Sequence, residues 1–303
     1  MNEPLSGVLV IDKPVGISSR EAVNRLARLL PRVKLGHAGT LDPAACGVLV
    51  VCVGKATRLI PYVQRMRKHY AATMHMGQCS STHDLEAPVE EVPFTGKIDA
   101  HSLEQSLSKF RGEIWQVPPQ HSAVHVQGQR AYERARRGET VALEPRRVSV
   151  ERLACVRFDY PVVELEIWCS SGTYVRSLVR DIGEDMGCGA VMTALNRNAI
   201  GPFGLSDALN LDQLNPQVVA ERLLPSRVAV QGLPAITVPD DQLEEVVHGR
   251  PIPGQSPADV HAASQEFALL NSTGELVALA QLDASGRLLR PRIVLIEPTT
   301  GER

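Results

Sequence analysis

The sequence predicts an α+β protein with a mixed, largely antiparallel sheet, followed by a small all-β module. Two observations carry this prediction. Strand and helix patterns follow one another irregularly over residues 1–230, without the repeated strand–helix alternation of a parallel α/β fold. Over residues 233–300, short strand patterns separated by tight turns dominate, as in a small barrel. We therefore expect two domains, at 1–230 and 233–300.

Length and composition fit such a protein. The 303 residues suffice for two domains, and 44% hydrophobic and 22% charged residues are ordinary for a globular chain. The net charge of −2 gives no sign of a polyanionic partner, although arginines cluster locally, as at Arg134, Arg136 and Arg137. Such clusters either hold phosphates or lie on solvated helix faces, and composition leaves both open.

The six cysteines are scattered, with no C-x-x-C pair and no histidine at ligand spacing. They are typical of small buried side chains in a reducing compartment, not of disulfides or a zinc site. The N-terminal residues do not resemble a signal peptide, and no apolar run approaches the roughly 20 residues that cross a bilayer. We expect a cytoplasmic protein that makes no membrane contact.

The N-terminal elements are predicted from apolar periodicity. Gly7–Ile11 has the composition of a short buried strand. Ser18 or Ser19 can cap a helix whose apolar residues recur at helical spacing, and Pro31 ends it. A glycine-rich loop at Gly36–Pro43 then leads into a second apolar strand.

The middle of the chain alternates helices and strands. Lys55–Tyr62 favours a short helix, and Lys68–Gly77 shows the alternation of a half-exposed antiparallel strand. Gln78–Pro88 is predicted to be a polar loop. Ala100–Phe110 has the spacing of an amphipathic helix.

Residues 117–147 differ from their surroundings, because they are polar, rich in arginine and poor in apolar residues. This composition predicts a protruding insertion. Val148–Phe158 and Val162–Trp168 then favour two strands. Thr173 can cap the helix that follows, and Gly187 is placed to stop it.

The C-terminal module is predicted from strand patterns separated by glycine-containing turns at Ser272–Gly274 and Ala284–Gly286. The expected strands are Ile236–Val238, Glu266–Leu270, Glu275–Leu282 and Arg292–Ile296.

The loop Gly36–Pro43 is the strongest local candidate for chemistry. Its glycines permit tight turns, and Pro43 biases Asp42 towards an extended conformation beside a buried strand. A carboxylate held on a stiff loop can act as a nucleophile or a base. Asp42 can equally be a turn former in an Asp-Pro pair, and the local pattern does not decide between the two.

Three other residues complement this acid. Tyr70 lies on an alternating strand, where its ring faces either a pocket or ordinary packing. Arg176 lies in the first turn of a helix, where the helix dipole disfavours a cation, so an acidic partner such as Asp42 or a ligand is expected unless the side chain is solvated. His37 precedes Asp42 on the glycine loop and fits a base or a stacking role.

Motifs that hold cofactors are absent from the sequence. There is no phosphate-binding G-x-x-x-x-G-K-[ST] loop, no G-x-G-x-x-G and no H-E-x-x-H. The G-x-S-x-G nucleophile elbow is also missing. We therefore expect chemistry without a cofactor or a metal.

Four stretches in order resemble the motifs of the TruB family of bacterial tRNA pseudouridine synthases, and the resemblance covers nearly the whole chain. Gly7–Pro14, with Gly16, Ser18 and Ser19, is similar to the lysine–proline motif. The catalytic motif is matched by Gly36–Pro43, Gly47–Leu49 and Gly54–Thr57. Lys68–Tyr70 resembles the tyrosine motif, and Ser171–Arg176 with Asp181–Gly183 resembles the arginine motif.

The resemblance implies that the protein isomerises the T-loop uridine of tRNA, at position 55, after flipping it out of the RNA. Asp42 would be the nucleophile, at the uracil ring or at the sugar carbon. Arg176 would pair with Asp42 and keep it ionised. This resemblance favours a catalytic role for Asp42 over a turn-forming one.

Further roles are implied for residues that bind the uridine. Tyr70 would stack on the uracil and assist the late proton loss, and His37 would fill the gap left by the flipped base. Tyr174 and Leu195 would shape the pocket.

The resemblance also implies how tRNA is held. Residues 117–147 would be a thumb-like insertion that grips the T arm, and the C-terminal module would be a PUA-like domain that contacts the acceptor end. No cofactor and no obligatory protein partner are implied, and we expect a monomer.

Four positions depart from the family pattern. Ser81, His121, His125 and Asn196 stand where an acid, a tyrosine, a lysine and an arginine are usual. These departures concern RNA contacts rather than chemistry. A non-catalytic tRNA-binding or tRNA-folding protein on the same scaffold is the alternative, and the intact Asp42 set argues against it as the only role. A guide-RNA-dependent relative is a weaker third option.

Overall fold

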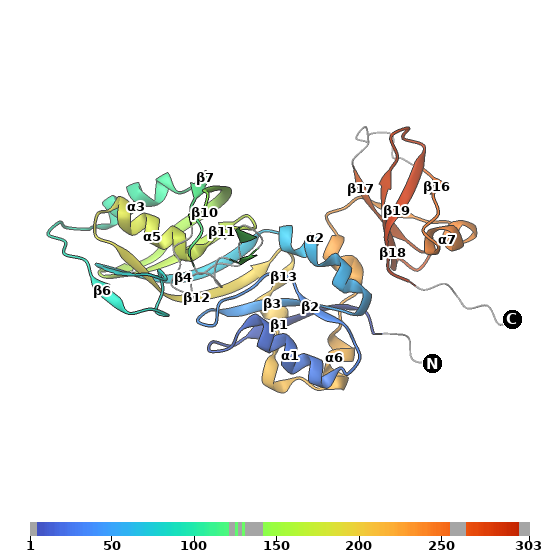
Figure 1. Ribbon diagram of the computed structural model, residues 1–303, viewed down its shortest axis with the longest axis horizontal. Helices are drawn as coiled ribbons and strands as arrows, with labels where there is room; N and C mark the ends of the chain where they lie inside the picture. The colour runs from blue at the N-terminus through green and yellow to red at the C-terminus, as the bar shows by residue number, and fades with distance from the viewer. Residues whose placement is uncertain (1–4, 121–124, 127–128, 131–141, 255–264, 297–303) are drawn as a thin grey trace.

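The computed structural model describes residues 5–120, 125–126, 129–130, 142–254 and 265–296. One long sheet runs through the main body, and a smaller β module lies beside it at the C-terminal end (Figure 1). The predicted α+β class with a mixed, largely antiparallel sheet is confirmed.

Ten strands form the main sheet, in the order β14-β1-β3-β12-β4-β11-β10-β7, with β2 added to β3 and β13 to β12. The pairs β1–β14 and β3–β12 are parallel, and the other described pairs of this sheet are antiparallel. The strands are β1 (Gly7–Lys13), β2 (Leu35–His37), β3 (Cys46–Val53), β4 (Lys68–Met76), β7 (Gly112–Gln116), β10 (Arg146–Asp159), β11 (Val162–Cys169), β12 (Ala190–Ile200), β13 (Phe203–Gly204) and β14 (Leu209–Asn210).

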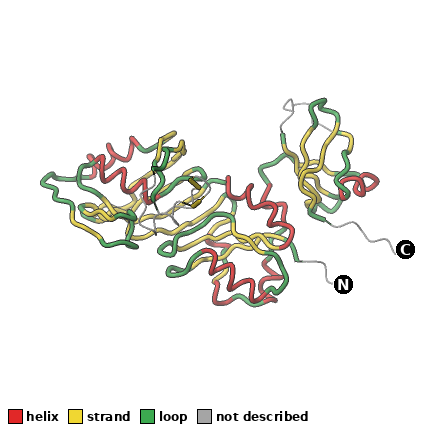
Figure 2. The backbone as a smooth tube through the Cα atoms, in the orientation of Figure 1, coloured by secondary structure: helices red, strands yellow, loops and turns green. Residues whose placement is uncertain are grey.

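Helices and short strands complete the body, as Figure 2 shows by colour. The α-helices are α1 (Ser19–Leu29), α2 (Ile60–Arg65), α3 (Ala100–Lys109), α5 (Val175–Asp185) and α6 (Pro216–Arg222). The 3-10 helices are η1 (Gly54–Leu59), η2 (Leu205–Asp207), η3 (Leu211–Gln213) and η4 (Ser226–Val230). Two short hairpins pair β5 (Gln78–Ser80) with β6 (Val89–Glu91) and β8 (His125–Val126) with β9 (Gln129–Arg130).

The main sheet is covered differently in its two halves, which we call the N-lobe (β1, β2, β3, β14) and the C-lobe (β4, β7, β10, β11, β12). In the N-lobe, α1 and α6 pack on one face, through Leu26 and Val219 for example, while η1, α2 and η4 pack on the other. In the C-lobe, α3 and α5 cover one face of β4, β10, β11 and β12, with Leu107 and Leu178 fully buried (Figure 1). Each lobe therefore has its own apolar core.

The lobes join where β3 runs parallel to β12. This pairing has only two residue pairs, Asn196 with Cys46 and Arg197 with Gly47. A side chain at Gly47, whose φ is +99°, would collide with the backbone of Arg197, so glycine is required at this close approach.

The C-terminal module is a five-stranded sheet in the order β15-β17-β18-β19-β16. Apolar side chains of this module, including Leu279 and Leu295, share a buried cluster with Leu59 and Val63 of the N-lobe. The elements are β15 (Ala235–Thr237), α7 (Asp240–Val247), β16 (Ile252–Pro253), β17 (Glu266–Leu270), β18 (Leu276–Leu282) and β19 (Leu288–Val294). The module therefore packs against the body through an apolar contact.

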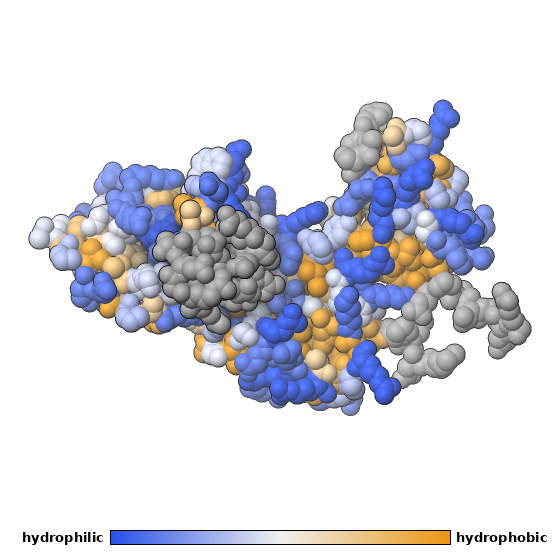
Figure 3. Space-filling model, viewed as in Figure 1, coloured by the Kyte–Doolittle hydropathy of each residue, from blue (hydrophilic) through white to orange (hydrophobic). Residues whose placement is uncertain are grey.

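Polar residues cover most of the face seen in Figure 3, with apolar patches exposed between them on the body and on the module. No helix in the described part of the chain is both long and apolar enough to cross a membrane.

Most sequence-predicted elements are found within a residue or two, and the differences have local causes. The helix predicted to be capped by Thr173 begins at Val175, with Tyr174 as its N-cap residue. The predicted loop Gln78–Pro88 begins with β5, because its first three residues pair with β6, which follows the loop. The strands β7 and β12 and the helices α6 and α7 were not predicted. Most of the expected insertion at 117–147 lies outside the described residues.

Candidate active site

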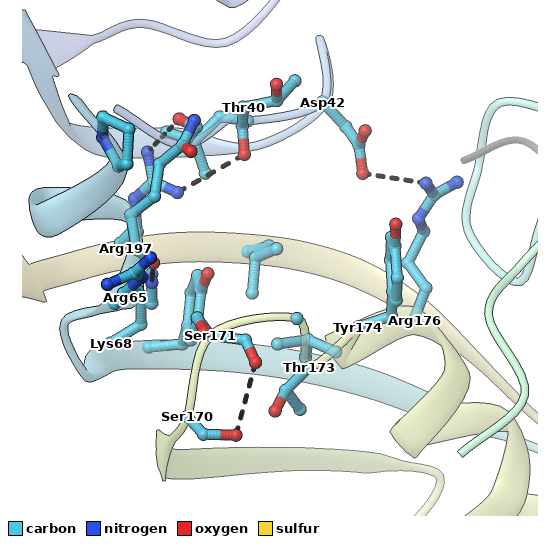
Figure 4. A pocket seen from close by; sticks show the side chains of 18 residues that line it. Thr40, Asp42, Arg65, Lys68, Ser170, Ser171, Thr173, Tyr174, Arg176 and Arg197 are labelled. Carbon is cyan, nitrogen blue, oxygen red and sulfur yellow. Dashed lines mark hydrogen bonds and ion pairs between the residues drawn. The ribbon is translucent and has the colours of Figure 1, made fainter. Parts of the chain in front are cut away.

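A pocket of about 610 Å³ lies between the N-lobe and the C-lobe, on the face of the C-lobe sheet that carries Tyr70. Its walls come from the loop before β3, the end of α2, the start of β4, the β11–α5 loop and β12. Figure 4 shows the side chains that line it. The volume is within the range of sites that hold small molecules or single nucleotides.

The loop that carries Asp42 is fixed by hydrogen bonds from outside it. The Ser19 hydroxyl accepts from the Leu41 amide at 2.8 Å and lies 3.0 Å from the Leu41 carbonyl oxygen, to which it donates. Arg197 donates to the carbonyl oxygens of Gly39 at 3.0 Å and Thr40 at 3.4 Å. These contacts hold the backbone from Gly39 to Leu41, directly before Asp42.

Asp42 contacts Arg176, as the resemblance implied. The Arg176 Nη2 atom lies 3.0 Å from Asp42 Oδ2, and the two side chains come from opposite lobes (Figure 4). The Nη1 atom of Arg176 lies 3.0 Å from Asp84 Oδ2. The side chains of Arg176 and Asp84 are 4% and 2% exposed, whereas that of Asp42 is 35% exposed. Arg176 is thus a buried cation held between two carboxylates, of which Asp42 alone is open to the pocket.

The start of α5 explains how Arg176 is placed. The side chain of Gln116, on β7, accepts from the Tyr174 amide at 2.8 Å and donates to the Tyr174 carbonyl oxygen at 3.1 Å. Gln116 therefore anchors Tyr174, the N-cap residue of α5. An arginine in the first turn is unfavourable to the helix dipole, and the two carboxylates compensate for this placement.

Burial raises the pKa of Asp42, and the Asp84 carboxylate raises it further. The Arg176 guanidinium acts in the opposite direction, as predicted, but burial outweighs it. The net shift of the Asp42 pKa is therefore upward, and the role of Arg176 in keeping Asp42 ionised stays a prediction.

Tyr70, Tyr174 and Leu195 line the pocket, on β4, at the start of α5 and on β12. Tyr70 is 8% exposed, and burial raises the pKa of its phenol. Tyr174 lies beside Arg176 in the view of Figure 4. All three residues therefore lie at the pocket, and the stacking and pocket-shaping roles that the resemblance implied stay predictions.

His37 is placed differently from the other predicted residues. It is the last residue of β2 and is not among the residues that line the pocket. Its Nδ1 atom is buried and has no hydrogen-bond partner in the described part of the chain. Burial, followed by the charges of Arg20 and Arg197, lowers the pKa of this imidazole. The gap-filling role that the resemblance implied for His37 stays a prediction.

Sequence reasoning missed four charged residues near the site, Lys13, Lys68, Asp84 and Arg197, all of which are buried. Lys13 donates to the carbonyl oxygens of Pro14 and Ile17 at 2.8 Å and shapes the turn after β1. Lys68 and Arg197 line the pocket itself. The available signals were that Lys68 belongs to the tyrosine motif and that Arg197 follows Leu195 by two residues.

Two of the departures can be located. Ser81 is exposed, in the loop that carries Asp84. The Asn196 side-chain oxygen is buried where a Cβ on Gly47 would stand, without a hydrogen-bond partner in the described residues. His121 lies outside the described residues, as does the His125 side chain. Within the described ranges, no group of three or more histidine, cysteine or acidic side chains is arranged to hold a metal ion.

Solved structures with this fold include chains from two larger complexes. One comes from an H/ACA RNP bound to a substrate RNA containing 2′-deoxyuridine, with a TM-score of 0.75, 25% identity, and coverage of 97% of this chain and 86% of that one. A second comes from a Cbf5-Nop10-Gar1 complex, with a TM-score of 0.74, 27% identity, and coverage of 96% and 85%.

Curated relatives match over nearly their full length. The chain is 40% identical over 287 residues to tRNA pseudouridine synthase B of Cutibacterium acnes, covering 93% of this chain and 95% of the relative. It is 41% identical over 283 residues to the protein of that name from Thermobifida fusca, covering 91% and 94%. The corresponding protein of Pseudomonas aeruginosa is 36% identical over 302 residues, with 96% of both chains covered.

Family models agree with these relatives. The model of the TruB family pseudouridylate synthase N-terminal domain matches residues 27–175, and that of the tRNA pseudouridylate synthase B C-terminal domain matches residues 176–233. Fold and family models together define a pseudouridylate synthase, an enzyme that isomerises uridine. The chain belongs to the TruB family of these synthases.

Proposed function

We propose that this enzyme isomerises the uridine at position 55, in the T loop of tRNA, with Asp42 as the nucleophile. The observation that carries the assignment of Asp42 is its contact with Arg176 inside the pocket. Asp42 is the one carboxylate among the described residues that line this pocket. The family and the names of the relatives support tRNA as the substrate.

The reaction requires the uracil to leave the sugar and return through a different atom. Asp42 adds to the nucleoside, at the uracil ring or at the sugar carbon, and the bond between the sugar and N1 of uracil breaks. The ring then turns, a bond forms between its C5 atom and the sugar, and the bond to Asp42 breaks, which frees the carboxylate. The hydrogen on C5 leaves as a proton, and N1 takes up a proton. No oxidant or reductant is consumed, because the product is an isomer of the substrate.

The side chains around Asp42 suit these steps. Arg176 orients the carboxylate and, through its second contact with Asp84, is itself held in place. Tyr70 is placed to stack on the uracil and to assist the late proton loss, while Tyr174 and Leu195 bound the space in which the ring turns. His37, outside the pocket wall, would take the place of the flipped uridine in the RNA.

Binding of tRNA would extend beyond the pocket. We propose that residues 117–147 grip the T arm and that the PUA-like module at 233–300 contacts the acceptor end. The enzyme would work as a monomer without an obligatory protein partner. Its six cysteines are all free, which fits a reducing compartment such as the cytoplasm.

Tritium release tests this function. A T-arm hairpin carrying uridine labelled at C5 is incubated with the wild type and with Asp42→Ala. We expect release by the wild type and none by Asp42→Ala, because the nucleophile is missing. Release by both proteins would show that Asp42 is not the nucleophile. If neither protein released tritium while the hairpin remained bound, the non-catalytic RNA-binding alternative would be favoured.

A further inference from the structure

The pocket has a second charged end, away from the contact between Asp42 and Arg176. Arg65, Lys68 and Arg197 line this end, from α2, β4 and β12 (Figure 4). Lys68 is 7% exposed and Arg197 is 1% exposed. We call these three residues the cationic end of the pocket.

The cationic end differs from Arg176 in what its side chains contact. Lys68 donates to the carbonyl oxygens of Gln64 and Met66. Arg197 donates to the carbonyl oxygen of Val48 at 2.8 Å and to the two loop carbonyl oxygens described above. Arg65 lies over the ring of Tyr62, with 5.8 Å from its guanidinium carbon to the ring centroid. Within the described residues, no carboxylate forms an ion pair with any of the three.

Carbonyl oxygens satisfy hydrogen-bond donors but do not neutralise charge. A buried cation without a counter-charge is costly, and in proteins such groups are normally paired. Two such cations on one pocket wall therefore point to an anion that arrives from outside. In an RNA substrate, the phosphodiester groups are the anions available at neutral pH.

We propose that the cationic end binds one of the two phosphodiesters that flank the target uridine. This inference rests on the proposed function, because a uridine held at Asp42 brings its own flanking phosphates into the same pocket. Lys68 provides the principal charge, Arg65 adds to it at the pocket mouth, and Arg197 contributes its field while holding the Asp42 loop. The pocket would then fix both the base and the backbone of one nucleotide.

The pKa of Lys68 supplements the geometry of the cationic end. Burial lowers the pKa of Lys68 to about 8, and the charge of Arg197 on β12 lowers it further, while Cys169 on β11 acts in the opposite direction. A phosphate next to the amine would favour the charged form and raise this pKa again.

A thermodynamic cycle between protein and RNA tests the proposal. The affinity of a T-arm hairpin is measured in the Asp42→Asn background, which prevents turnover, with and without Lys68→Gln. Each flanking phosphodiester is replaced in turn by a neutral methylphosphonate. We expect one replacement to weaken binding to the Lys68 protein about tenfold and to have little effect on the Lys68→Gln protein, as for a lost charge-assisted hydrogen bond.

Arg67→Gln is the matched control. Arg67 is adjacent to Lys68 in sequence, but its side chain is 70% exposed and pairs with Glu151. Its effect on affinity should be the same for the unmodified and the modified hairpins. Arg65→Gln is a second test variant, since its exposed position makes misfolding a smaller concern than at buried Lys68. We expect Arg65→Gln to be coupled to the same phosphodiester, with a smaller change in hairpin affinity.

The proposal would be overturned if, for both Lys68→Gln and Arg65→Gln, the loss of hairpin affinity simply added to the loss caused by either methylphosphonate. Tritium release by the wild type from the unmodified hairpin separates this failure from a failure of the proposed function. If the wild type releases tritium while the losses are additive, the phosphate site alone is wrong. If it releases none, the proposed function itself fails.

Discussion

The two ends of the pocket balance charge in opposite ways. At one end Arg176 lies between Asp42 and Asp84, so a buried cation is compensated by two acids. At the other end Lys68 and Arg197 are equally buried and contact carbonyl oxygens instead. A buried cation that is paired with carboxylates of the protein needs no ligand to balance its charge, and the pairing fixes its geometry. A buried cation without such a partner gains most of its stabilisation when an anion binds. The first arrangement suits a nucleophile and the second suits recognition.

The largest effect that can break this comparison is expected from Asp84→Asn. Arg176 keeps its contact with Asp42 but loses its second, buried anchor, so the guanidinium no longer has one fixed orientation. We expect kcat to fall about 10²-fold with KM nearly unchanged, and the free energy of unfolding to fall by about 2 kcal/mol. Single-turnover kinetics on a T-arm hairpin and urea unfolding measure both.

Asp181→Asn is the control for this variant, because Asp181 pairs with Arg180 on the same helix and does not line the pocket. It should leave kcat close to the wild-type value. An Asp84→Asn enzyme with wild-type kcat would mean that Arg176 needs no second anchor.

The charged form of Lys68 gives a second, smaller effect. With a pKa of about 8 in the free protein, Lys68 loses its proton as pH rises above that value. If the charged amine binds phosphate, hairpin affinity falls with rising pH, by about tenfold per unit at most for one proton. Affinities from pH 7 to 9.5, in the Asp42→Asn background, should show this fall, and Lys68→Gln should flatten it. An identical pH profile in both proteins would contradict the role of Lys68.

The smallest effect concerns the acid limb of the rate profile. Because burial raises the pKa of Asp42, the fraction of the nucleophile that is ionised falls at a higher pH than for an exposed aspartate. The acid limb of kcat/KM should thus have its midpoint above 3.8, the ordinary value for the group. Removing the charge of Asp84 should move this midpoint to lower pH. A midpoint that moves upward in Asp84→Asn would reverse the sign of the coupling.

Much of the fold and the reacting residues could be predicted from the sequence, because their signals are local. Apolar periodicity located β1, α1 and β4, and the family motifs singled out Asp42, Tyr70 and Arg176. The structure brings these three residues to one pocket. The helix α7 was missed, although Pro239 directly precedes it, two acids stand in its first turn and apolar residues recur within it at helical spacing.

The rest of the site could not be predicted, because burial of a charge is a tertiary property. Asp84 follows a strand in a polar loop and looks solvated in the sequence, yet it is buried and pairs with Arg176 in the first turn of α5. Arg197 and Lys68 are ordinary basic residues until β12 and β4 bring them to the same wall. Thr173 has the right chemistry for a helix cap, but Gln116 from a distant strand anchors the helix start instead.

The narrow junction between the lobes has a mechanical consequence. β3 and β12 are joined by two residue pairs, and Asp42 precedes this junction in the N-lobe, while Arg176 belongs to the C-lobe. The ion pair therefore links the two lobes across this junction. Any substitution that changes the angle between the lobes, however distant from the pocket, changes the separation of these two side chains. The reactivity of the Asp42 carboxylate therefore depends on how the two lobes are arranged relative to each other.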